Sequence, residues 1–188
     1  MPDYLNYYKA FIIIMKCMHF ENPTKGYKNL KVCEQPLPTL AADEVIIKVA
    51  ASSVNRIDLM QANGTYPIPP GVTEVGGLDC SGYIVDPETL EPIDDQLVIG
   101  LLNGGAYAQY AKLNKDMVIK APKNFTKVEA ASIPEVWITA YQLLKFVLQV
   151  DENSDKYALI YAAASGVGTS LIQLCKLFGL KSIAVSSS

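Results

Sequence analysis

The 188-residue sequence has few of the residues that metal sites and nucleophilic catalysis require. It contains one histidine and four cysteines, and no two cysteines have the Cys-x-x-Cys spacing of a zinc-ligand pair. The lone histidine, His19, lies in the first strand-like run, where a structural role is more common than catalysis. No Ser-His-Asp or Cys-His set can be assembled around it. We therefore expect no bound metal and no hydrolase-type nucleophile.

A strong net charge and a long apolar run are also missing. The formal net charge is −3, and no basic cluster stands out, which disfavours nucleic acid and anionic membranes as partners. The first twenty residues contain no arginine, no small-residue cleavage site and only a short apolar run. They indicate neither a targeting sequence nor a membrane span. Scattered cysteines in such a chain are typical of reduced thiols, so we expect a cytoplasmic protein.

The sequence from Met15 to about residue 120 favours β structure. Short runs with apolar alternation, such as 43–52 and 76–85, are separated by clusters of proline, glycine and asparagine. The exception is the segment 55–62, which is predicted to form one or two helical turns that end at Asn63-Gly64. Many short strands with tight turns are typical of a small barrel or sandwich.

After residue 120 the pattern changes to helices. Thr126 with Glu129 three residues later predicts the capping box of a short helix. Pro134 suits the first turn of a second helix over 134–150. The residues that this helix is expected to bury are spaced three and four apart: Trp137, Tyr141, Leu144 and Leu148.

The last forty residues predict the start of a parallel α/β sheet. A buried strand over 156–161 is followed by a glycine-containing turn and a helix over 166–179, with Gly179 at its C-terminal end. A second buried strand follows over 181–187. A strand, a turn, a helix and a second strand form the first unit of a parallel sheet.

The turn in this unit has the composition of a phosphate-binding loop. Residues 161–176 read YAAASGVGTSLIQLCK. Small side chains let backbone N–H groups approach a pyrophosphate, and the helix N-terminus supplies partial positive charge. Only two glycines of the usual three are certain, so a turn that merely packs the helix on the strand is the alternative. The candidate cofactor-binding residues are Ala163, Ser165, Gly166, Val167 and Gly168, with the Ser165 hydroxyl as a phosphate donor.

The position about twenty residues beyond the loop bears on the choice between NADH and NADPH. An acidic residue there accepts the ribose 2′-hydroxyl of NADH. This chain has serines at 186–188 and no carboxylate. Because hydroxyl groups suit a 2′-phosphate, the sequence favours NADPH as cofactor, with Ser188 as a candidate contact.

Several segments in fixed order together resemble one family, the zinc-free quinone oxidoreductases of the medium-chain dehydrogenase/reductase superfamily, related to zeta-crystallin. The tumour-suppressor-inducible subgroup is the most similar. The resemblance runs from about Met15 to the end of the chain. The segments that carry it are KVAASSVNRIDLMQANGTYPIPPG, GLDCSGYIV, GGAYAQYAKL, AASIPEVWITAYQLL and SGVGTSLIQLCKLFG.

The resemblance implies an α/β fold with a β-rich part. A GroES-like catalytic domain over 15–132 would follow an N-terminal extension of residues 1–14. The first β-α-β unit of a Rossmann doubly wound parallel sheet, a partial NADP-binding domain, would occupy 133–188. The implied activity is hydride transfer from NADPH to a quinone or a related electron-poor carbonyl compound, in a protein that forms a homodimer at full length.

The same resemblance explains the expected absence of zinc. Asn55 stands where zinc-dependent relatives have a catalytic cysteine. The segment Gly77-Leu78-Asp79 replaces their Gly-His-Glu, so the histidine ligand is missing. The polarisation of a substrate oxygen then falls to other side chains.

Three residues match the family's positions around the nicotinamide and the substrate. Asn55 would hydrogen-bond substrate or cofactor, Tyr66 would donate to the quinone oxygen, and Thr139 would meet the nicotinamide. Each has a structural alternative. Asn55 could stabilise a turn, Tyr66 could be a surface aromatic, and Thr139 could bond its own helix backbone. Asp58 is expected to anchor the local fold.

The family's chains continue well beyond residue 188. A sheet of two strands and one helix leaves apolar faces open, so we expect the 188-residue chain alone to be poorly soluble or inactive. Two further functions stay open. One is an alkenal or enoyl reductase that uses the same hydride on a conjugated C=C bond. The other is a truncated, non-catalytic nucleotide-binding remnant.

Overall fold

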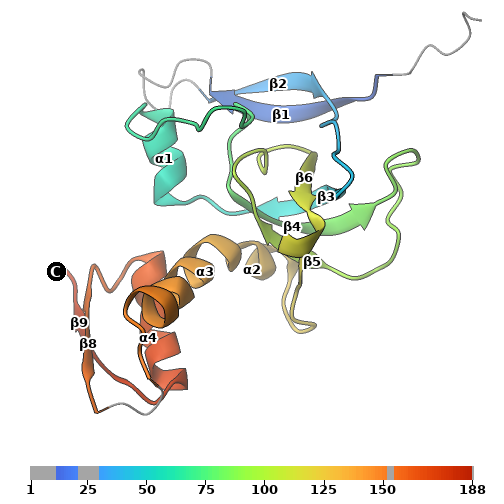
Figure 1. The fold of residues 1–188 in the computed structure, drawn as a ribbon. Coiled ribbons are helices and arrows are strands. Elements are labelled where there is room, and N and C mark those ends of the chain that lie inside the picture. Colours follow the sequence, from blue (N-terminus) through green and yellow to red (C-terminus); the bar gives the residue numbers. More distant parts are fainter. Residues whose placement is uncertain (1–11, 21–29, 152–154, 188) are drawn as a thin grey trace, which may run out of the picture.

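The computed structural model describes residues 12–20, 30–151 and 155–187 (Figure 1). Ser188 and most of the predicted extension lie outside these ranges. The predicted fold class is confirmed, because an antiparallel β-rich part is followed by a parallel β-α-β unit. None of the described helices has the length and apolar composition of a membrane span.

A five-stranded antiparallel sheet forms the centre of the β-rich part, with strand order β6-β3-β4-β5-β7. Its apolar core includes Ile47 and Cys80, which belong to one cluster and are both 0% exposed. The strands span Glu44–Ser52 (β3), Asp79–Val85 (β4), Val98–Leu101 (β5), Tyr110–Asn114 (β6) and Ile119–Lys120 (β7).

The hairpin of β1 (Ile14–Phe20) and β2 (Leu30–Pro36) is a separate two-stranded sheet. It adjoins the rest of the β-rich part through isolated bridges, one of which pairs Cys17 with Ala108. The Met18 N–H also donates to the Tyr107 carbonyl at 2.7 Å. The hairpin is thus attached to the central part along one strand, β1.

Two short helices lie where the sequence predicted them. The α1 helix (Arg56–Ala62) has Asn55 as its N-cap residue. The α2 helix (Lys127–Ala131) begins with the predicted capping box: Thr126 N–H donates to Glu129 Oε2 at 2.8 Å, and Glu129 N–H donates to Thr126 Oγ1 at 3.2 Å. These reciprocal bonds satisfy backbone donors that a helix start leaves free.

The predicted helix over 134–150 is only partly correct. An α-helix, α3, spans Pro134–Gln142, and a π-helical turn continues over Leu143–Val147. Leu144 is buried as predicted, but Tyr141 and Leu148 are 43% and 62% exposed. A π turn adds about one residue to a turn, so Leu148, which follows it, no longer lies on the face that Leu144 buries.

The chain ends in the predicted β-α-β unit: β8 (Tyr157–Tyr161), α4 (Gly166–Leu177) and β9 (Lys181–Val185), with the strands parallel. The prediction that both strands are buried is wrong. In β8 only Ile160 is buried, and all of β9 is exposed. Parallel strands are buried when helices cover both faces, whereas the described helices α3 and α4 lie on one side of this sheet (Figure 1).

Candidate functional site

Asn55 lies in the connection between β3 and α1 and is half-buried. Its amide Nδ2 donates to Ser53 Oγ at 2.9 Å, which orients the side chain. Its backbone N–H donates to Asp58 Oδ2 at 2.7 Å. Asp58 therefore anchors the start of α1, as predicted. The Asn55 side chain also takes part in a capping box with the backbone N–H of Asp58, so its second amide N–H is the group left to interact with a ligand.

Asp79, at the start of β4, connects the β-rich part with α3. Its side chain is 0% exposed. Ser53 Oγ donates to Asp79 Oδ1 at 2.6 Å, and the Glu135 backbone N–H, in the first turn of α3, donates to Asp79 Oδ2 at 3.3 Å. A carboxylate is favourable at a helix N-terminus because the helix dipole is positive there. In the sequence this position stands out only as part of the lost zinc motif, which gives no sign of its structural role.

Three carboxyl groups and a phenol gather around this point. Burial raises the pKa of Asp58 and the charge of Asp79 adds to this, while hydrogen bonds from Asn55, Tyr107 and Gly77 act in the opposite direction. Burial also raises the pKa of Glu135, and the charges of Asp79 and Asp58 raise it further. Charge repulsion and burial thus oppose ionisation of both groups.

Tyr107, in the loop before β6, is the phenol of this cluster. Its hydroxyl donates to the Ser53 carbonyl at 3.0 Å. Burial raises the pKa of Tyr107, and the nearby charge of Asp58 and their hydrogen bond raise it further. The phenol therefore stays protonated and acts as a donor.

Replacement of Glu135 by glutamine is expected to stabilise the protein at pH 7 but not at pH 4. Because the folded-state pKa of Glu135 is raised, the folded protein binds more protons than the unfolded chain, and stability falls as pH rises through this range. Glutamine carries no charge, so the substitution removes this loss of stability at pH 7. The gain is below about 1 kcal/mol because the group is partly solvated. Thermal melts at both pH values measure it.

The exposed Glu88 provides the matched control for this substitution. Glu88→Gln should leave the melting temperature nearly unchanged at pH 7 and at pH 4. An equal gain from both substitutions, or a gain from Glu135→Gln that persists at pH 4, would contradict the proposed repulsion at the start of α3.

The predicted phosphate loop is held in a defined conformation. Ser165 is the N-cap of α4, and its Oγ accepts the Gly168 N–H at 3.1 Å. Ala163 is 4% exposed, and its N–H donates to the Val185 carbonyl at 2.9 Å. Ala162 adopts a left-handed backbone conformation with φ of 51°. The loop is therefore fastened both to α4 and to the end of β9.

Gly168 is required by packing. A Cβ on Gly168 would lie 2.5 Å from the Ala162 carbonyl oxygen and 2.7 Å from the Ala163 Cα. No side chain at this position can avoid these backbone atoms, so glycine allows α4 to begin directly against the loop. This confirms the predicted close packing between helix and turn.

The loop offers an open helix N-terminus to an anion. Ser165 and Gly166 are exposed, Val167 is half-buried and packs inward, and the first turn of the 12-residue α4 contains no acidic residue. Ser165 Oγ accepts a hydrogen bond from the backbone, so its own proton is free for a ligand. Backbone N–H groups together with the positive end of a helix dipole suit a phosphate.

Asn55 and this loop are linked through the first turn of α3. Asn55 contacts Ser53, Ser53 contacts Asp79, and Asp79 bonds the α3 N-terminus. In that turn Val136 meets the loop, because a Cβ on Gly166 would lie 2.8 Å from Val136 Cγ1. The structure thus brings a predicted substrate-side residue and the phosphate loop into one connected region.

Thr139 and Tyr66, the other two residues predicted near the nicotinamide and the substrate, are not part of this chain of contacts. Thr139 is half-buried on α3, one turn after Glu135. Tyr66 follows α1, is 41% exposed and donates its backbone N–H to the Met60 carbonyl at 3.2 Å. Within the described part of the chain, no hydrogen bond joins Tyr66 to Asn55 or Thr139. The roles of both residues stay predictions.

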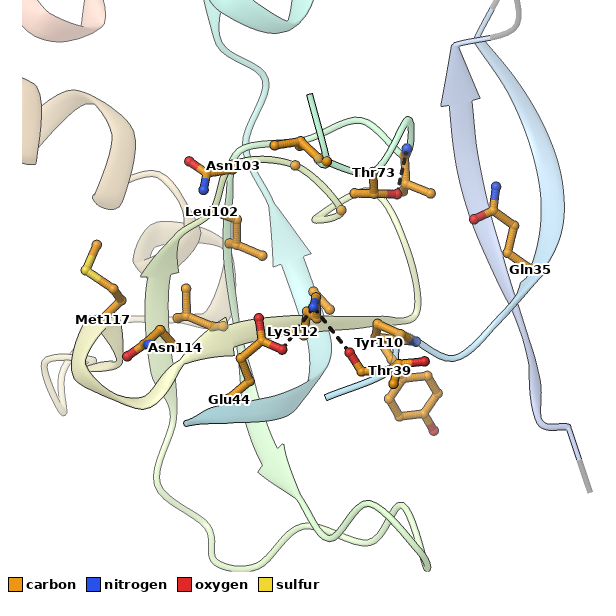
Figure 2. A pocket seen from close by; sticks show the side chains of 18 of the residues that line it. Gln35, Thr39, Glu44, Thr73, Leu102, Asn103, Tyr110, Lys112, Asn114 and Met117 are labelled. Atoms are coloured by element: carbon orange, nitrogen blue, oxygen red, sulfur yellow. Dashed lines mark hydrogen bonds and ion pairs between the residues drawn. The ribbon is translucent and has the colours of Figure 1, made fainter. Parts of the chain in front are cut away.

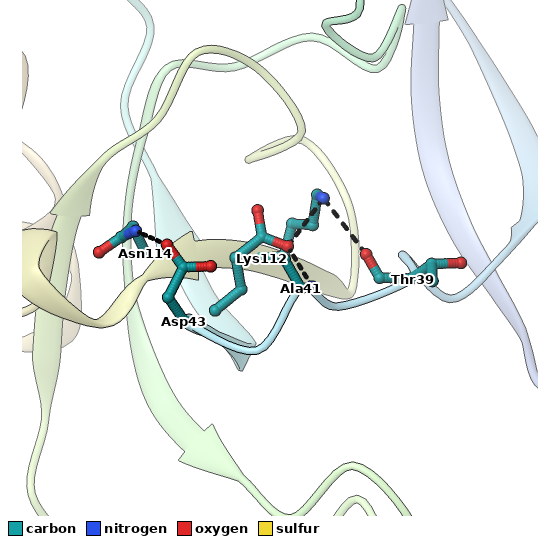
Figure 3. A network of polar contacts seen from close by, with 6 residues as sticks. Thr39, Ala41, Asp43, Lys112 and Asn114 are labelled. Carbon is teal, nitrogen blue, oxygen red and sulfur yellow. Dashed lines mark hydrogen bonds and ion pairs between the residues drawn. The ribbon is translucent and has the colours of Figure 1, made fainter.

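A cavity of about 760 Å³ lies elsewhere, between the hairpin and the five-stranded sheet, and none of the predicted site residues lines it (Figure 2). The charged groups at its edge are already paired. Lys112 Nζ lies 2.9 Å from Glu44 Oε2 and donates to the Thr39 carbonyl at 3.2 Å. Figure 3 shows this network extended by the bond from Asn114 Nδ2 to Asp43 Oδ2 at 2.6 Å. These contacts tie β3 to β6, and the two charged groups that line the cavity, Lys112 and Glu44, are paired with each other.

Possible metal ligands are dispersed. Among the residues with described positions, no group of three or more histidine, cysteine, aspartate or glutamate side chains is arranged to hold a metal ion. The side chain of His19 is instead 3.6 Å from Glu74, measured from Nε2 to Oε2. The absence of zinc stays a prediction that rests on Asn55 and Leu78 at the former ligand positions.

Comparison with known proteins identifies the domain that surrounds Asn55. Residues 41–123 match the model of the alcohol dehydrogenase GroES-like domain. A zinc-type alcohol dehydrogenase-like protein of Staphylococcus aureus is 33% identical over 184 residues, which cover 92% of this chain and 54% of that protein. The 2-methylene-furan-3-one reductase of Solanum lycopersicum is 30% identical, with 81% of this chain and 42% of the reductase covered. The chain spans about half the length of these relatives.

Solved structures extend the likeness through the β-α-β unit. The quinone oxidoreductase of Coxiella burnetii matches with a TM-score of 0.76 and 28% identity, covering 94% of this chain and 57% of that one. A mycobacterial protein complexed with NADPH matches with a TM-score of 0.76 and 29% identity, covering 93% and 52%. The domain boundaries at 15 and 133 stay predictions. Residues 41–123 of this chain are therefore similar to the alcohol dehydrogenase GroES-like domain, and they are followed by a Rossmann-type β-α-β unit within the region that the solved oxidoreductase structure matches.

Proposed function

We propose that this chain takes part in the NADPH-dependent, zinc-independent reduction of quinones. The observation that carries the proposal is the exposed N-terminus of α4 with its small-residue loop, connected through the first turn of α3 to Asn55. The relatives named as a quinone oxidoreductase and as an NADPH complex support it. A homodimer and a cytoplasmic location stay predictions.

The loop fits the diphosphate of a dinucleotide. Ser165 Oγ–H and the backbone N–H groups of Gly166 and Val167 would hold the phosphate oxygens, and the Gly168 contact keeps the loop close to the helix. NADPH, when bound, would supply the hydride. Ser186 and Ser187 are exposed beyond β9, where hydroxyl groups can bond a 2′-phosphate. Ser188, the third candidate, lies outside the described residues.

Asn55 is the chain's best candidate for positioning the reacting groups. Ser53 accepts one amide N–H of Asn55, and the second N–H would donate to the nicotinamide carboxamide or to the substrate oxygen. Thr139 on α3 would contact the nicotinamide, and the phenol of Tyr66 would donate to the quinone oxygen. Proton donation at that oxygen would lower the barrier to hydride transfer.

A conjugated alkene is the second candidate substrate class. The relative from Solanum lycopersicum is named as a reductase of 2-methylene-furan-3-one, whose C=C bond is conjugated to a carbonyl group. The same proton donor at the carbonyl oxygen would serve both reactions. Comparison of NADPH oxidation with 1,4-benzoquinone and with an α,β-unsaturated ketone separates them, measured on a protein that carries this chain together with a complete nucleotide-binding sheet. Faster turnover of the ketone favours this candidate.

The test of the proposed function is a titration of the 188-residue chain with NADPH, followed through its backbone amide NMR signals. We expect saturable shifts confined to the loop and the first turn of α4, centred on Gly166 and Val167. NADH should produce smaller shifts if the serines recognise a 2′-phosphate. The absence of shifts at these amides with millimolar NADPH would overturn the proposal.

A further inference from the structure

Two cysteines of the N-terminal hairpin face each other. Cys17 of β1 and Cys33 of β2 are directly opposite in the antiparallel register. Their Sγ atoms lie 3.0 Å apart. Residues directly opposite in an antiparallel pair project to the same face, so the two thiols share one environment. An S–S bond is about 2.05 Å long, so its formation requires a movement of only about 1 Å.

The backbone around this pair permits a cross-link. Alternate β1 residues bond away from β2: the Gln109 N–H donates to the Lys16 carbonyl, and the Met18 N–H donates to the Tyr107 carbonyl. The N–H and C=O of Cys17, between them, are therefore directed to β2. In such a hydrogen-bonded pair the Cα atoms are about 5.5 Å apart, within the range that disulfides span.

We propose that Cys17 and Cys33 form a reversible disulfide by exchange with a low-molecular-weight disulfide such as oxidised glutathione. This proposal does not depend on the proposed function. It concerns two of the four free thiols, while Cys80 and Cys175 are both 0% exposed and belong to separate core clusters.

The two thiols differ in access, which fixes the order of the steps. Cys33 is half-buried, whereas Cys17 is 3% exposed. Burial raises the pKa of the Cys17 thiol to about 12, and the hydrogen bond and charge of Cys33 contribute. The thiolate of Cys33 therefore attacks the external disulfide first. One glutathione thiolate leaves, and a mixed disulfide forms on Cys33.

The second step closes the bond within the hairpin. Cys17 releases its proton to solvent, its sulfur attacks Cys33 Sγ, and the second glutathione leaves as a thiolate. The protein loses two hydrogen atoms, and two electrons reduce one oxidised glutathione to two thiols. Because the hairpin meets the central part through Cys17–Ala108 and Met18–Tyr107, the cross-link would stiffen the strand that touches Tyr107.

The test is incubation of the full 188-residue chain with excess oxidised glutathione, followed by mass spectrometry and counting of free thiols. We expect the intact mass to fall by two hydrogen atoms and the count to fall from four to two. A reducing agent should restore both. Peptide mapping should place the new bond between Cys17 and Cys33. A chain that keeps four thiols, or a bond between other cysteines, would overturn the proposal.

Two variants separate the steps. Cys17→Ser lacks the resolving thiol, so glutathione should accumulate as a stable mixed disulfide on Cys33. Cys33→Ser lacks the accessible thiol, so it should gain neither an internal bond nor glutathione on Cys17. If Cys17→Ser fails to fold, Cys33→Ser and the wild-type mapping still decide the result. Glutathione on Cys17 of the Cys33→Ser variant would contradict the proposed order.

Discussion

The Ser165→Asp variant is expected to bind NADPH more weakly while it keeps its thermal stability. Aspartate caps a helix N-terminus as well as serine does, and its charge is favourable to the helix dipole. The same charge would lie where the proposed diphosphate binds. Two unit charges about 4 Å apart repel by about 1 kcal/mol in water and about 4 kcal/mol near a protein surface. This corresponds to a loss of affinity of roughly five-fold to a thousand-fold.

The matched control for this experiment is Ser165→Asn. Asparagine is an equivalent N-cap residue without charge, so NADPH affinity should fall by much less. Fluorescence titration with NADPH measures affinity, and circular dichroism melts measure stability. Equal affinity in the aspartate and asparagine variants would remove the α4 N-terminus from the cofactor site. A Gly168→Val variant is a poorer test, because any side chain there collides with backbone atoms of the loop even without a ligand.

Gly82→Ala is expected to produce the largest loss of stability in the β-rich part. Gly82 of β4 pairs with Val49 of β3 in the central sheet. A Cβ at this position would collide with the Lys48 carbonyl oxygen and lie 2.7 Å from Ile47 Cγ2. Relief requires separation of two paired strands, at a cost of about 3 kcal/mol or more. This is a large part of a typical stability of about 5–15 kcal/mol. Urea denaturation followed by far-UV circular dichroism provides the measurement.

Gly71→Ala distinguishes this collision from a general effect of replacing glycine. Gly71 has a φ of +83°, but no heavy atom lies within 4 Å of a Cβ built there. Alanine should therefore cost only the strain of the left-handed conformation, about 1 kcal/mol. Equal urea midpoints for the two variants would show that β3 and β4 are not paired in this register.

The features that could be predicted from sequence depend on signals between near neighbours. The capping box of Thr126 and Glu129, the short helix after Asn55 and the tight start of α4 at Gly168 all follow from residues within a few positions of each other. The β-α-β unit follows from apolar runs separated by a small-residue turn.

The features that were missed depend on contacts between distant segments. Asp79 bonds Ser53 and the Glu135 N–H from positions 26 and 56 residues away. Nothing in the local sequence indicates that this one carboxylate connects them. The exposure of β8 and β9 was missed because apolar composition shows what can be buried, not whether neighbouring elements cover it. The Cys17–Cys33 pair had a usable signal, since both cysteines lie in adjacent alternating runs that pair as a hairpin.

The bond between Asp79 and the Glu135 N–H fixes the start of α3 to the β-rich part, so a tilt of the helix would pivot at this end. The nine residues of α3 extend about 13 Å from this point, so a tilt of about 10° displaces the far end at Gln142 by about 2 Å. Gly166 packs closely against Val136, which lies in the first turn of α3 near this pivot. In such a tilt of α3 the distance between the phosphate loop and Asn55 would therefore change little, while parts of the β-α-β unit farther from the pivot would move more.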